Sequence, residues 1–372
     1  MSQKEIQIGV IGAGAIARRA HLPAWRSLRD SLALRVTAIA DTSAVAVAEA
    51  AEEFGIPASY TSYEELLADP AIDVVDICAP TPAHHEIGMK ALRAGKHVLM
   101  EKPMVLSLAE ALDLYRAAQD SGRVLSVVQN YRYMDATKRA SERVAMGNLG
   151  AVNSIHANAL TRFPSTWTVG TWLYHPRAVL YDFTPHVIDL LLYLHKSRPR
   201  RVIATGRTLP DADFLVAAQA LIEFEDGSTA LLDCAWVTSV FKFALDMHGS
   251  GCSIHLEPMQ GIFHESVANT TPLDATLDFA RDTWGTVFGT LSGRHYAKPL
   301  NAYLGFFTDF VAALRAGTPP PVTAEEGLWV NVVLEACWHS IQTGQPVELK
   351  EFLDTFETQH SRQSGELSPA FR

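Results

Sequence analysis

The chain of 372 residues is longer than one ordinary hydrophobic core organises, so we expect two domains. Its composition, 48% hydrophobic and 19% charged, is typical of a globular protein and excludes a disordered or fibrous one. A net charge of −10 without a long basic run would repel a phosphate backbone, which argues against a nucleic-acid partner.

The four cysteines lie far apart and form no C-x-x-C pair, so the sequence predicts neither a metal site nor a disulfide framework. The N-terminus leads directly into a strand pattern, which leaves no room for a signal peptide. No apolar stretch is long enough to cross a bilayer. We therefore expect a cytoplasmic protein with reduced thiols and no membrane partner.

The first third of the chain alternates short apolar runs with helical patterns. Strands are expected at residues 6–11, 35–40, 74–79, 97–100 and 124–128, and helices at 43–54, 86–94 and 107–121. Strands that are apolar on both faces and alternate with helices indicate a parallel sheet covered by helices. The sequence therefore predicts an α/β fold, a doubly wound sheet, at this end.

Beyond residue 129 the pattern changes. Strands are expected at 152–159, 217–225 and 228–237, and Asp226-Gly227 is a hairpin turn signal. We expect an α+β domain with a large, mostly antiparallel open sheet. The predicted domains are 1–128 and 129–372, with a helix at 324–342 that packs back toward the first domain.

Three further segments are interpreted from composition. The basic cluster of Arg198, Arg200 and Arg201 around Pro199 is interpreted as a solvated loop. Residues 277–291 are expected to form a helix, and the polar tail after Leu353 is expected to be partly disordered.

The strand at 230–237 carries apolar residues on both faces. Leu232, Cys234 and Trp236 share one face, and Leu231 and Ala235 share the other. A sheet with one face in water alternates more cleanly. We therefore expect helices on one face and a second subunit on the other, in a homodimer or homotetramer.

A glycine-rich turn follows the first strand. Gly12-Ala13-Gly14-Ala15-Ile16-Ala17 fits G-x-G-x-x-A and opens a helix, the context that dinucleotide binding requires. The glycines permit a tight turn, and the N–H groups of the helix N-terminus bind the pyrophosphate. A merely tight turn is the alternative interpretation.

Asp41 ends the second strand, where its carboxylate can accept hydrogen bonds from the adenosine ribose. The same charge would repel a 2′-phosphate by up to roughly 4 kcal/mol at about 4 Å and an effective dielectric of about 20. No arginine follows it directly, since the next residues are Thr42 and Ser43. The sequence thus favours NAD(H) over NADP(H).

Two later motifs identify a family. The third strand ends in Cys78-Ala79-Pro80-Thr81-Pro82-Ala83-His84, and the fourth in Met100-Glu101-Lys102-Pro103. Together with the glycine turn they resemble the glucose–fructose oxidoreductase/inositol dehydrogenase/rhizopine catabolism (Gfo/Idh/MocA) family. The resemblance covers most of the chain, through residues 129–133, the D-x-x-x-H motif at 182–186, and residues 324–327 and 344–347.

The resemblance implies a Rossmann domain followed by an open sheet used for substrate binding and oligomerisation. It implies that Lys102 lies near the nicotinamide and the substrate hydroxyl, and that His186 acts as acid/base with Asp182 nearby. The further positions expected near the cofactor are Ala79, Thr81, His84, Glu101 and Asn130. Arg132 is expected to contact substrate, and a structural role is the alternative for His84.

The residue chemistry agrees with these roles. Removal of hydride from a carbinol carbon requires a base for the hydroxyl proton, commonly histidine. Thr184-Pro185 is a helix-start signal, with threonine as the cap, which places His186 in the first turn. There the helix dipole favours the neutral ring by roughly 0.3–1 kcal/mol. Asp182 would orient the ring or bind a second hydroxyl. The alternatives are that Lys102 is an ordinary surface lysine and that His186 is a helix histidine held by hydrogen bonds.

Aromatic residues precede the D-x-x-x-H motif. Trp167 and Trp172 are candidates for packing against sugar C–H surfaces, with ordinary core aromatics as the alternative. Many relatives have a glycine pair shortly before the aspartate, whereas this chain has Arg177-Ala178-Val179-Leu180-Tyr181. We therefore expect Arg177 or Tyr181 to shape a pocket that differs from those of such relatives.

These observations predict an NAD(H)-dependent oxidoreductase that interconverts alcohol and ketone at a carbon of a sugar, inositol or related polyol. Two alternatives stay open. One is a glycosidase that oxidises and re-reduces its sugar with bound NAD, and the other is a non-catalytic sugar or cofactor sensor.

Overall fold

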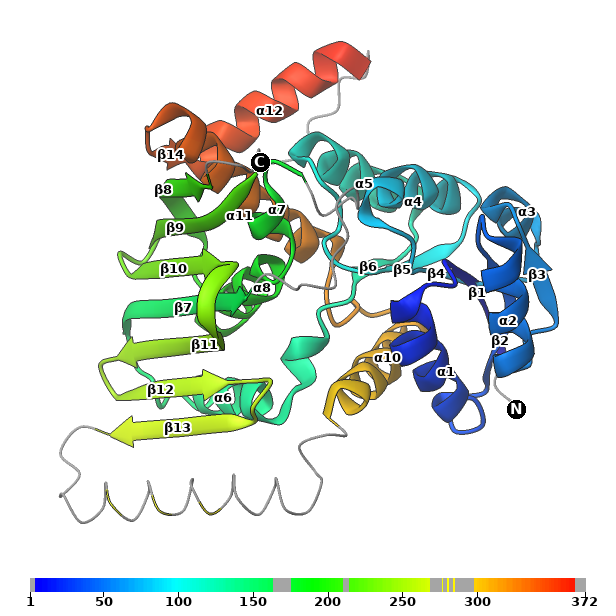
Figure 1. Ribbon diagram of the computed structural model, residues 1–372, viewed down its shortest axis with the longest axis horizontal. Coiled ribbons are helices and arrows are strands. Elements are labelled where there is room, and N and C mark those ends of the chain that lie inside the picture. Colours follow the sequence, from blue (N-terminus) through cyan, green and yellow to red (C-terminus); the bar gives the residue numbers. More distant parts are fainter. Residues whose placement is uncertain are drawn as a thin grey trace. The chain divides into compact units, whose positions relative to one another are not determined.

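The computed structural model of the protein describes residues 4–162, 175–209, 214–267, 276, 280, 284 and 298–364. The chain forms two compact units (Figure 1). The first comprises Met1–Leu106, Asp113–Met134 and Tyr296–Leu328, and the second comprises Ser107–Leu112, Asp135–His295 and Trp329–Arg372. The division differs from a single boundary at residue 129, because the segment Tyr296–Leu328 returns to the first unit.

The first unit contains a six-stranded sheet in the order β3-β2-β1-β4-β5-β6, with every pair parallel. The strands are β1 (Ile6–Ile11), β2 (Leu34–Ala40), β3 (Ala58–Tyr60), β4 (Val74–Ile77), β5 (His97–Met100) and β6 (Leu125–Val127). This strand order is that of a doubly wound dinucleotide-binding sheet, so the predicted α/β fold is confirmed. The sequence pattern did not predict β3, which is short and has no buried residue.

Helices connect these parallel strands, as the sequence predicts. They are η1 (Ala17–His21), α1 (Leu22–Leu28), α2 (Ala44–Phe54), α3 (Tyr63–Ala68), η2 (Thr81–Ala83), α4 (His84–Arg93) and α5 (Leu108–Ser121). The turn η3 (Asn130–Tyr133) follows β6, and α10 (Lys298–Ala316) belongs to the same unit but comes from a later part of the chain. Local signals set their ends. The side chain of Ser43 caps α2 by accepting from the Ala46 N–H at 3.2 Å, and α2 ends at Gly55, whose φ is 65°.

The second unit contains an eight-stranded sheet in the order β13-β12-β11-β7-β10-β9-β8-β14. Its strands are β7 (Val152–Arg162), β8 (Pro199–Thr208), β9 (Leu215–Phe224), β10 (Thr229–Ala235), β11 (Val237–Gly249), β12 (Cys252–Glu257), β13 (Ile262–Val267) and β14 (Val347–Glu348). Only the β7–β10 pair is parallel, so the prediction of a mostly antiparallel sheet is confirmed.

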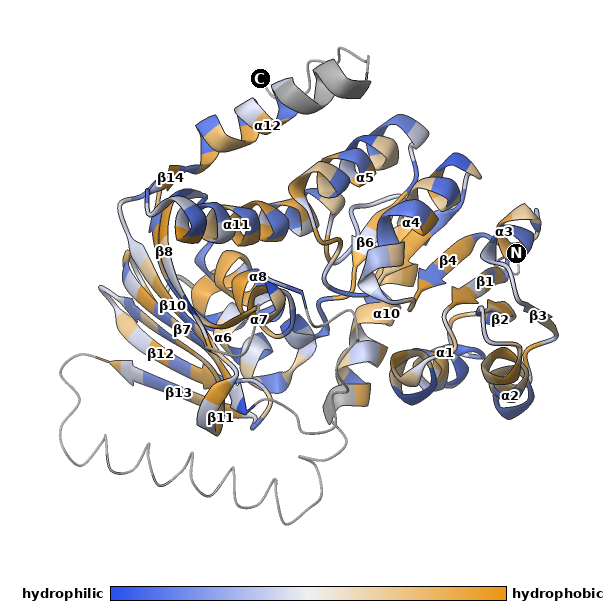
Figure 2. Ribbon diagram, turned by 45° about the horizontal axis from the view of Figure 1, so that its top comes forward, coloured by the Kyte–Doolittle hydropathy of each residue, from blue (hydrophilic) through white to orange (hydrophobic). Residues whose placement is uncertain are grey.

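Helices cover one face of this second sheet (Figure 2). They include α6 (Asp135–Ala145), α7 (Ala178–Tyr181) and α8 (Thr184–His195), while α11 (Ala324–Thr343) and α12 (Leu349–Ser364) come from the C-terminal part of the chain. On the opposite face, cross-strand pairing aligns Ile203, Leu221 and Leu231 in one row. Ile203 is 42% exposed and Leu231 is 51% exposed, which makes an apolar stripe on this face.

Several sequence predictions need correction. The basic cluster is not a loop, because Arg200 and Arg201 lie on β8 and pair with Glu223 and Glu348. The segment after Leu353 continues the helix α12 as far as Ser364. The third predicted strand ends at Ile77, since Ala79 already belongs to the following turn. The helix expected at 277–291 falls mostly outside the described residues.

The described part of the chain has no helix of the length and apolar character that a membrane crossing requires.

Candidate functional site

The glycine turn joins β1 to the first helix, and its two glycines serve different purposes. Gly12 has φ 105°, and a Cβ there would lie 2.7 Å from the carbonyl carbon and oxygen of Cys78. Only glycine therefore lets β1 and the end of β4 approach so closely. A Cβ on Gly14 would meet nothing within 4 Å, and Gly14, Ala15 and Ile16 are exposed.

This turn fits a dinucleotide. The surface over Gly14 is open, and the N–H groups of the first helical turn, which lack intrahelical partners, are those that bind a pyrophosphate. The helix continues with the π-helical turn η1, whose last residue is His21. Wider π-turns within helices are frequent at functional sites.

Asp41 follows β2 and lies beside the glycine turn. Its Oδ2 accepts from the Ala13 N–H at 2.8 Å, and its Oδ1 accepts from the Ser43 N–H at 2.8 Å. These two bonds fix the carboxylate, and each oxygen keeps a second lone pair for a ribose hydroxyl. The structure thus brings Asp41 and Ala13 together, as the motif predicts.

His84 connects two loops at the carboxyl ends of β4 and β5. Its buried ring has Nε2 2.8 Å from the Ala79 carbonyl oxygen and Nδ1 3.0 Å from that of Pro103. Burial lowers the pKa of His84 below the usual 6.5, and the main-chain carbonyls on both sides of the ring hold it in place. This geometry favours the structural role. Thr81 is also buried, in η2 between Ala79 and His84.

Glu101 and Lys102 follow β5 at the carboxyl edge of the sheet, where open α/β sheets bind ligands. Glu101 is buried, and its Oε2 accepts from the Lys102 N–H at 3.0 Å. Its Oε1 accepts from the Tyr303 hydroxyl at 3.3 Å and lies 2.9 Å from Nε2 of His21. The Lys102 side chain is half-buried.

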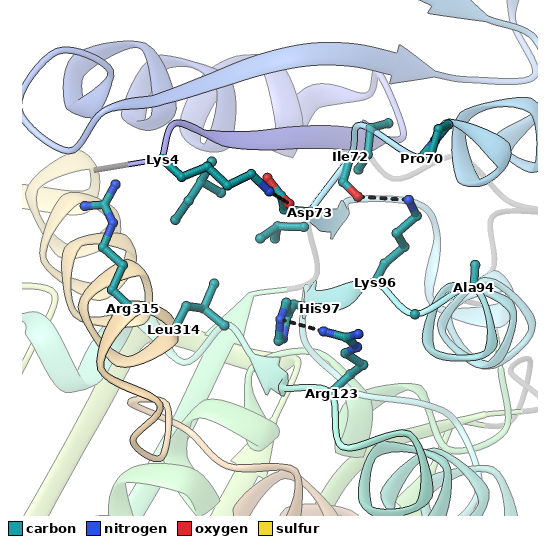
Figure 3. Close-up of a pocket in the computed structure, with 13 residues that line it drawn as sticks. Lys4, Pro70, Ile72, Asp73, Ala94, Lys96, His97, Arg123, Leu314 and Arg315 are labelled. Carbon is teal, nitrogen blue, oxygen red and sulfur yellow. Dashed lines mark hydrogen bonds and ion pairs between the residues drawn. The ribbon is translucent and has the colours of Figure 1, made fainter. Parts of the chain in front are cut away.

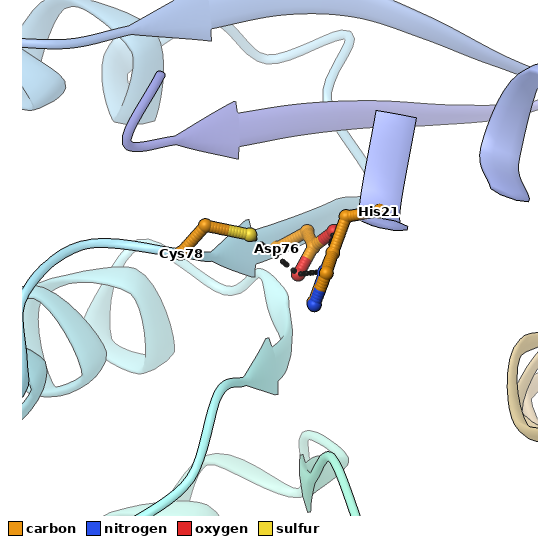
Figure 4. A group of neighbouring side chains, drawn as sticks. All are labelled: His21, Asp76 and Cys78. Atoms are coloured by element: carbon orange, nitrogen blue, oxygen red, sulfur yellow. Dashed lines mark hydrogen bonds and ion pairs between the residues drawn. The ribbon is translucent and has the colours of Figure 1, made fainter. Parts of the chain in front are cut away.

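His21 and Asp76 form a buried network with Glu101. Figure 4 shows His21 and Asp76 together with Cys78. Nδ1 of His21 lies 2.9 Å from Oδ2 of Asp76, which also accepts from the Trp25 indole N–H at 2.7 Å. Burial alone would lower the pKa of His21, but the charge of Asp76 and the hydrogen bond to it raise that pKa well above 6.5. Burial raises the pKa of Glu101, and His21 outweighs this and lowers it below 4.5.

His21, Asp76 and Cys78 are residue types that ligate metals, and their ligand atoms lie within 4.8 Å of one another. The geometry nevertheless describes a hydrogen-bonded network. The Cys78 thiol donates to Asp76 at 3.7 Å, and both oxygens of Asp76 lie within hydrogen-bond distance of His21 Nδ1.

A cavity of about 680 Å³ lies at the opposite edge of the same sheet (Figure 3). Its lining includes Ile6, Val74 and His97, which begin β1, β4 and β5. Two of its cations bind main-chain carbonyls that follow helices: Lys96 donates to Asp69 O and Ile72 O, and Arg315 donates to Leu32 O and Ala33 O. A third cation, Lys4, pairs with the Asp73 carboxylate at 2.6 Å. The cavity is therefore remote from the glycine turn and is not the cofactor site.

Asn130 and Arg132 lie in η3 and are both buried. Arg132, expected to contact substrate, donates to Glu326 Oε1 at 2.8 Å and to Pro321 O at 3.1 Å. Glu326 also forms a capping box with Thr323 at the start of α11. Within the first unit, Arg132 thus anchors the N-terminus of α11, and a substrate contact by Arg132 stays a prediction.

The D-x-x-x-H motif belongs to the second unit. His186 is buried in the first turn of α8, and Asp182 precedes that helix, as predicted. Thr184 is not the cap, because it already lies inside α8 and its hydroxyl donates to Val179 O at 2.7 Å. Asp182 Oδ2 accepts from the Trp236 indole N–H at 3.2 Å.

The segment before the motif also departs from the expected glycine pair. Arg177 donates to both oxygens of Glu335 at 2.8 Å, which satisfies its charge within the second unit. The Tyr181 hydroxyl is buried and has no hydrogen-bond partner in the described part of the chain. Trp167 and Trp172 lie outside the described residues.

The structure brings Gly12, Ala13, Gly14, Asp41, Ala79, His84, Glu101 and Lys102 to one edge of the first sheet. His186 and Asp182 belong to the other unit. Sequence reasoning missed His21, Asp76 and Trp236. A charged residue inside the apolar run Val74–Ile77 was a signal for Asp76, since buried carboxylates require a partner.

Two family models match the chain. "Oxidoreductase family, NAD-binding Rossmann fold" matches residues 6–129, and "GFO/IDH/MocA C-terminal domain" matches residues 137–255. Together they cover more than half of the sequence.

Similar proteins align over nearly the whole chain. A 1,5-anhydro-D-fructose reductase of Ensifer adhaerens is 28% identical over 92% of this chain and 98% of its own length. D-xylose 1-dehydrogenase (NADP(+)) 2 of Haloferax volcanii is 27% identical over 92% of this chain and 100% of its own. An oxidoreductase from Agrobacterium radiobacter, solved with NAD+, L-tartaric acid and magnesium, shares the fold with a TM-score of 0.79 at 18% identity, covering 94% of this chain and 100% of that one.

Proposed function

Because the chain belongs to the Gfo/Idh/MocA family of oxidoreductases, we propose that it transfers hydride between NAD(H) and a secondary alcohol or ketone carbon of a sugar, inositol or related polyol. The observation that carries the proposal is the carboxyl edge of the first sheet. There an open glycine turn, Asp41 and Lys102 follow β1, β2 and β5 of a sheet with a dinucleotide-binding strand order. The sugars in the names of two matched relatives support a substrate of this class.

The proposed chemistry divides between two side chains. A bound nicotinamide would supply the acceptor for the hydride that leaves the carbinol carbon. His186 accepts the hydroxyl proton as the carbonyl forms, and Lys102 donates a hydrogen bond to the substrate oxygen. The products are the ketone, the reduced cofactor and one proton. Asp182 orients the ring or binds a second hydroxyl, and the indole N–H of Trp236 holds its carboxylate in place.

We propose NAD(H) as the preferred cofactor. The Asp41 carboxylate is fixed by two backbone N–H groups at the end of β2, where it would repel a 2′-phosphate. One of the similar proteins is named for NADP+, so the preference for NAD(H) in this chain has to be measured. The comparison is initial rates with the two cofactors at matched concentrations.

We further propose that two copies of the chain pair through the exposed face of the eight-stranded sheet. The apolar row of Ile203, Leu221 and Leu231 supports this, because isolated apolar stripes on a sheet face favour association. Light scattering on a size-exclusion column measures the mass. A monomer would contradict the proposal.

The decisive experiment is a screen of sugars, inositols and polyols with NAD+, followed by the absorbance of the reduced nicotinamide. A substrate of this class should produce NADH in proportion to the ketone formed. Hydrolysis of a glycoside without net NADH would replace the proposal with a redox glycosidase. Cofactor binding without turnover of any class member would favour a sensor.

Variants then test the two roles. Lys102→Met and His186→Ala should each retain cofactor binding and lose turnover by roughly 10²–10⁴-fold, the usual contribution of a positioned acid or base. Arg93→Gln, an exposed change in the first unit, serves as the control with unchanged rates. A near-wild-type rate in either variant would remove that residue from the mechanism.

A further inference from the structure

We propose that His21 is a positioning residue, which as an imidazolium bridges Asp76 and Glu101 and thereby fixes the peptide from which the Lys102 side chain extends. The inference rests on the role proposed above for Lys102. It concerns only residues of the first unit, and neither the glycine motif nor the E-K-P motif contains His21 or Asp76.

The hydrogen-bond partners determine the charge state of the ring. Asp76 accepts from Trp25 and Cys78, and Glu101 accepts from Tyr303 and the Lys102 N–H, so the surroundings of both carboxyl groups supply donors, which favour their ionised form. The two ring nitrogens of His21 face these carboxylates at 2.9 Å each. A neutral imidazole has one N–H and would direct its lone pair at one carboxylate. The imidazolium donates to both.

The surroundings protect this ion triad from water. His21 and Asp76 are 0% exposed and Glu101 is 7% exposed. Two rings of α10 enclose the imidazole, with centroid distances of 5.2 Å to both Tyr303 and Phe307. Ionised groups buried in this way are stable only as a fully hydrogen-bonded set, and aromatic faces favour a cation.

The triad connects three elements of the proposed cofactor edge. His21 ends η1, the helical turn that continues from the glycine motif, Asp76 lies on β4, and Glu101 follows β5. The last bond in the series runs from the Lys102 N–H to Glu101 Oε2 at 3.0 Å. Loss of the bridge would let the Glu101–Lys102 peptide shift, and a displacement of about 1 Å at a reacting group can cost roughly 10²-fold in rate.

Nuclear magnetic resonance of the ¹⁵N-labelled histidine side chains tests the charge state without any assay of activity. At about pH 8, where an unperturbed histidine is neutral, both ring nitrogens of His21 should carry protons. The spectrum of His21→Gln identifies the His21 signals by their disappearance. Half-buried His85, which faces only Asp113 at 3.2 Å, is the internal reference. A single protonated nitrogen on His21 would overturn the proposal.

Kinetics test the positioning role. His21→Gln should lower kcat by roughly 10- to 100-fold and change the position of the alkaline limb of its pH profile, while the Kd for NAD+ changes by less than about threefold. Glu101→Gln should have a similar effect, and the double variant should be little worse than either single one, because both remove the same bridge. His85→Gln should leave kcat and the pH profile unchanged.

The outcomes separate this inference from the proposed function. If Lys102→Met is inactive while His21→Gln keeps the wild-type kcat and pH profile, the positioning role is wrong and the function stands. If Lys102→Met retains turnover, the role of Lys102 is wrong, and the ¹⁵N spectrum still decides the charge of His21. Additive losses in the double variant would also contradict the bridge.

Discussion

Charged side chains at the two edges of the parallel sheet are stabilised by different kinds of partner. At the carboxyl edge, charged side chains bond to one another in the triad of His21, Asp76 and Glu101. At the amino edge, Lys96 and Arg315 donate to main-chain carbonyls around an open cavity. The first arrangement fixes side chains relative to each other, and the second completes helix ends. The size of a cavity is thus a weaker guide to function than the partners of its charges.

The largest effect on stability is expected at Gly12, where the carboxyl edge has no space for a side chain. Gly12→Ala should destabilise the protein by about 3 kcal/mol or more, because the Cβ would overlap the Cys78 carbonyl in a strained backbone conformation. Gly14→Ala, whose Cβ meets nothing within 4 Å, should leave stability unchanged and weaken NAD+ binding. Thermal unfolding and cofactor titration measure the two effects. A Gly12→Ala variant as stable as the wild type would contradict the close approach.

The dependence of stability on pH should differ in sign between the edges. The raised pKa of His21 means that its stabilisation is complete below 6.5 and is lost as the pH rises through the folded-state value. The lowered pKa of Glu101 means that its stabilisation is lost as the pH falls below 4.5. At the amino edge, burial lowers the pKa of Lys96 below 10.5, so its deprotonation at alkaline pH favours the fold.

Unfolding midpoints across a pH series measure this contrast. The wild type should lose stability at alkaline pH more steeply than His21→Gln, which has no proton to lose at that position. Lys96→Met should show an alkaline loss at least as steep as that of the wild type. Parallel curves for wild type and His21→Gln would contradict the charged state of His21.

A smaller effect is expected at the amino edge. Lys96→Met removes the donor to Asp69 O at 2.6 Å and to Ile72 O at 2.9 Å. The free energy of unfolding should fall by about 1–3 kcal/mol, because the two carbonyls lose this hydrogen-bond partner. The Kd for NAD+ and kcat should not change. Arg93→Gln at an exposed position of α4 is the control, expected within about 0.5 kcal/mol of the wild type. A kinetic effect of Lys96→Met without loss of stability would give the amino edge a function.

The contrast also explains what the sequence could and could not predict. Strands β1 and β5 were predicted with their observed bounds, because buried parallel strands are continuous apolar runs ended by turn residues. The glycine turn and Asp41 were found because a local motif encodes them. β8 was missed because Pro199 and three nearby arginines look like a loop, and the acids that pair with two of them, Glu223 and Glu348, are distant in sequence.

The triad could not be predicted from the sequence for the same reason. Asp76 lies 55 positions after His21 and Glu101 lies 80 positions after it, so no spacing rule connects the three residues. Each alone has an ordinary interpretation as a helix histidine or a strand-end acid. Likewise, Arg132 was expected at substrate from the family resemblance, while Glu326, its observed partner, lies in α11, far along the sequence.

The smallest effect concerns the choice of cofactor at the carboxyl edge. Asp41→Asn keeps the size of the side chain and an oxygen acceptor for the Ala13 or Ser43 N–H, and it removes the negative charge. The ratio of kcat/KM for NADP+ to that for NAD+ should rise by about tenfold, equivalent to about 1.4 kcal/mol. The change is modest because no arginine follows to bind the added phosphate. An unchanged ratio would mean that the Asp41 charge does not select the cofactor and that Asp41 acts only through its hydrogen bonds to the Ala13 and Ser43 N–H groups.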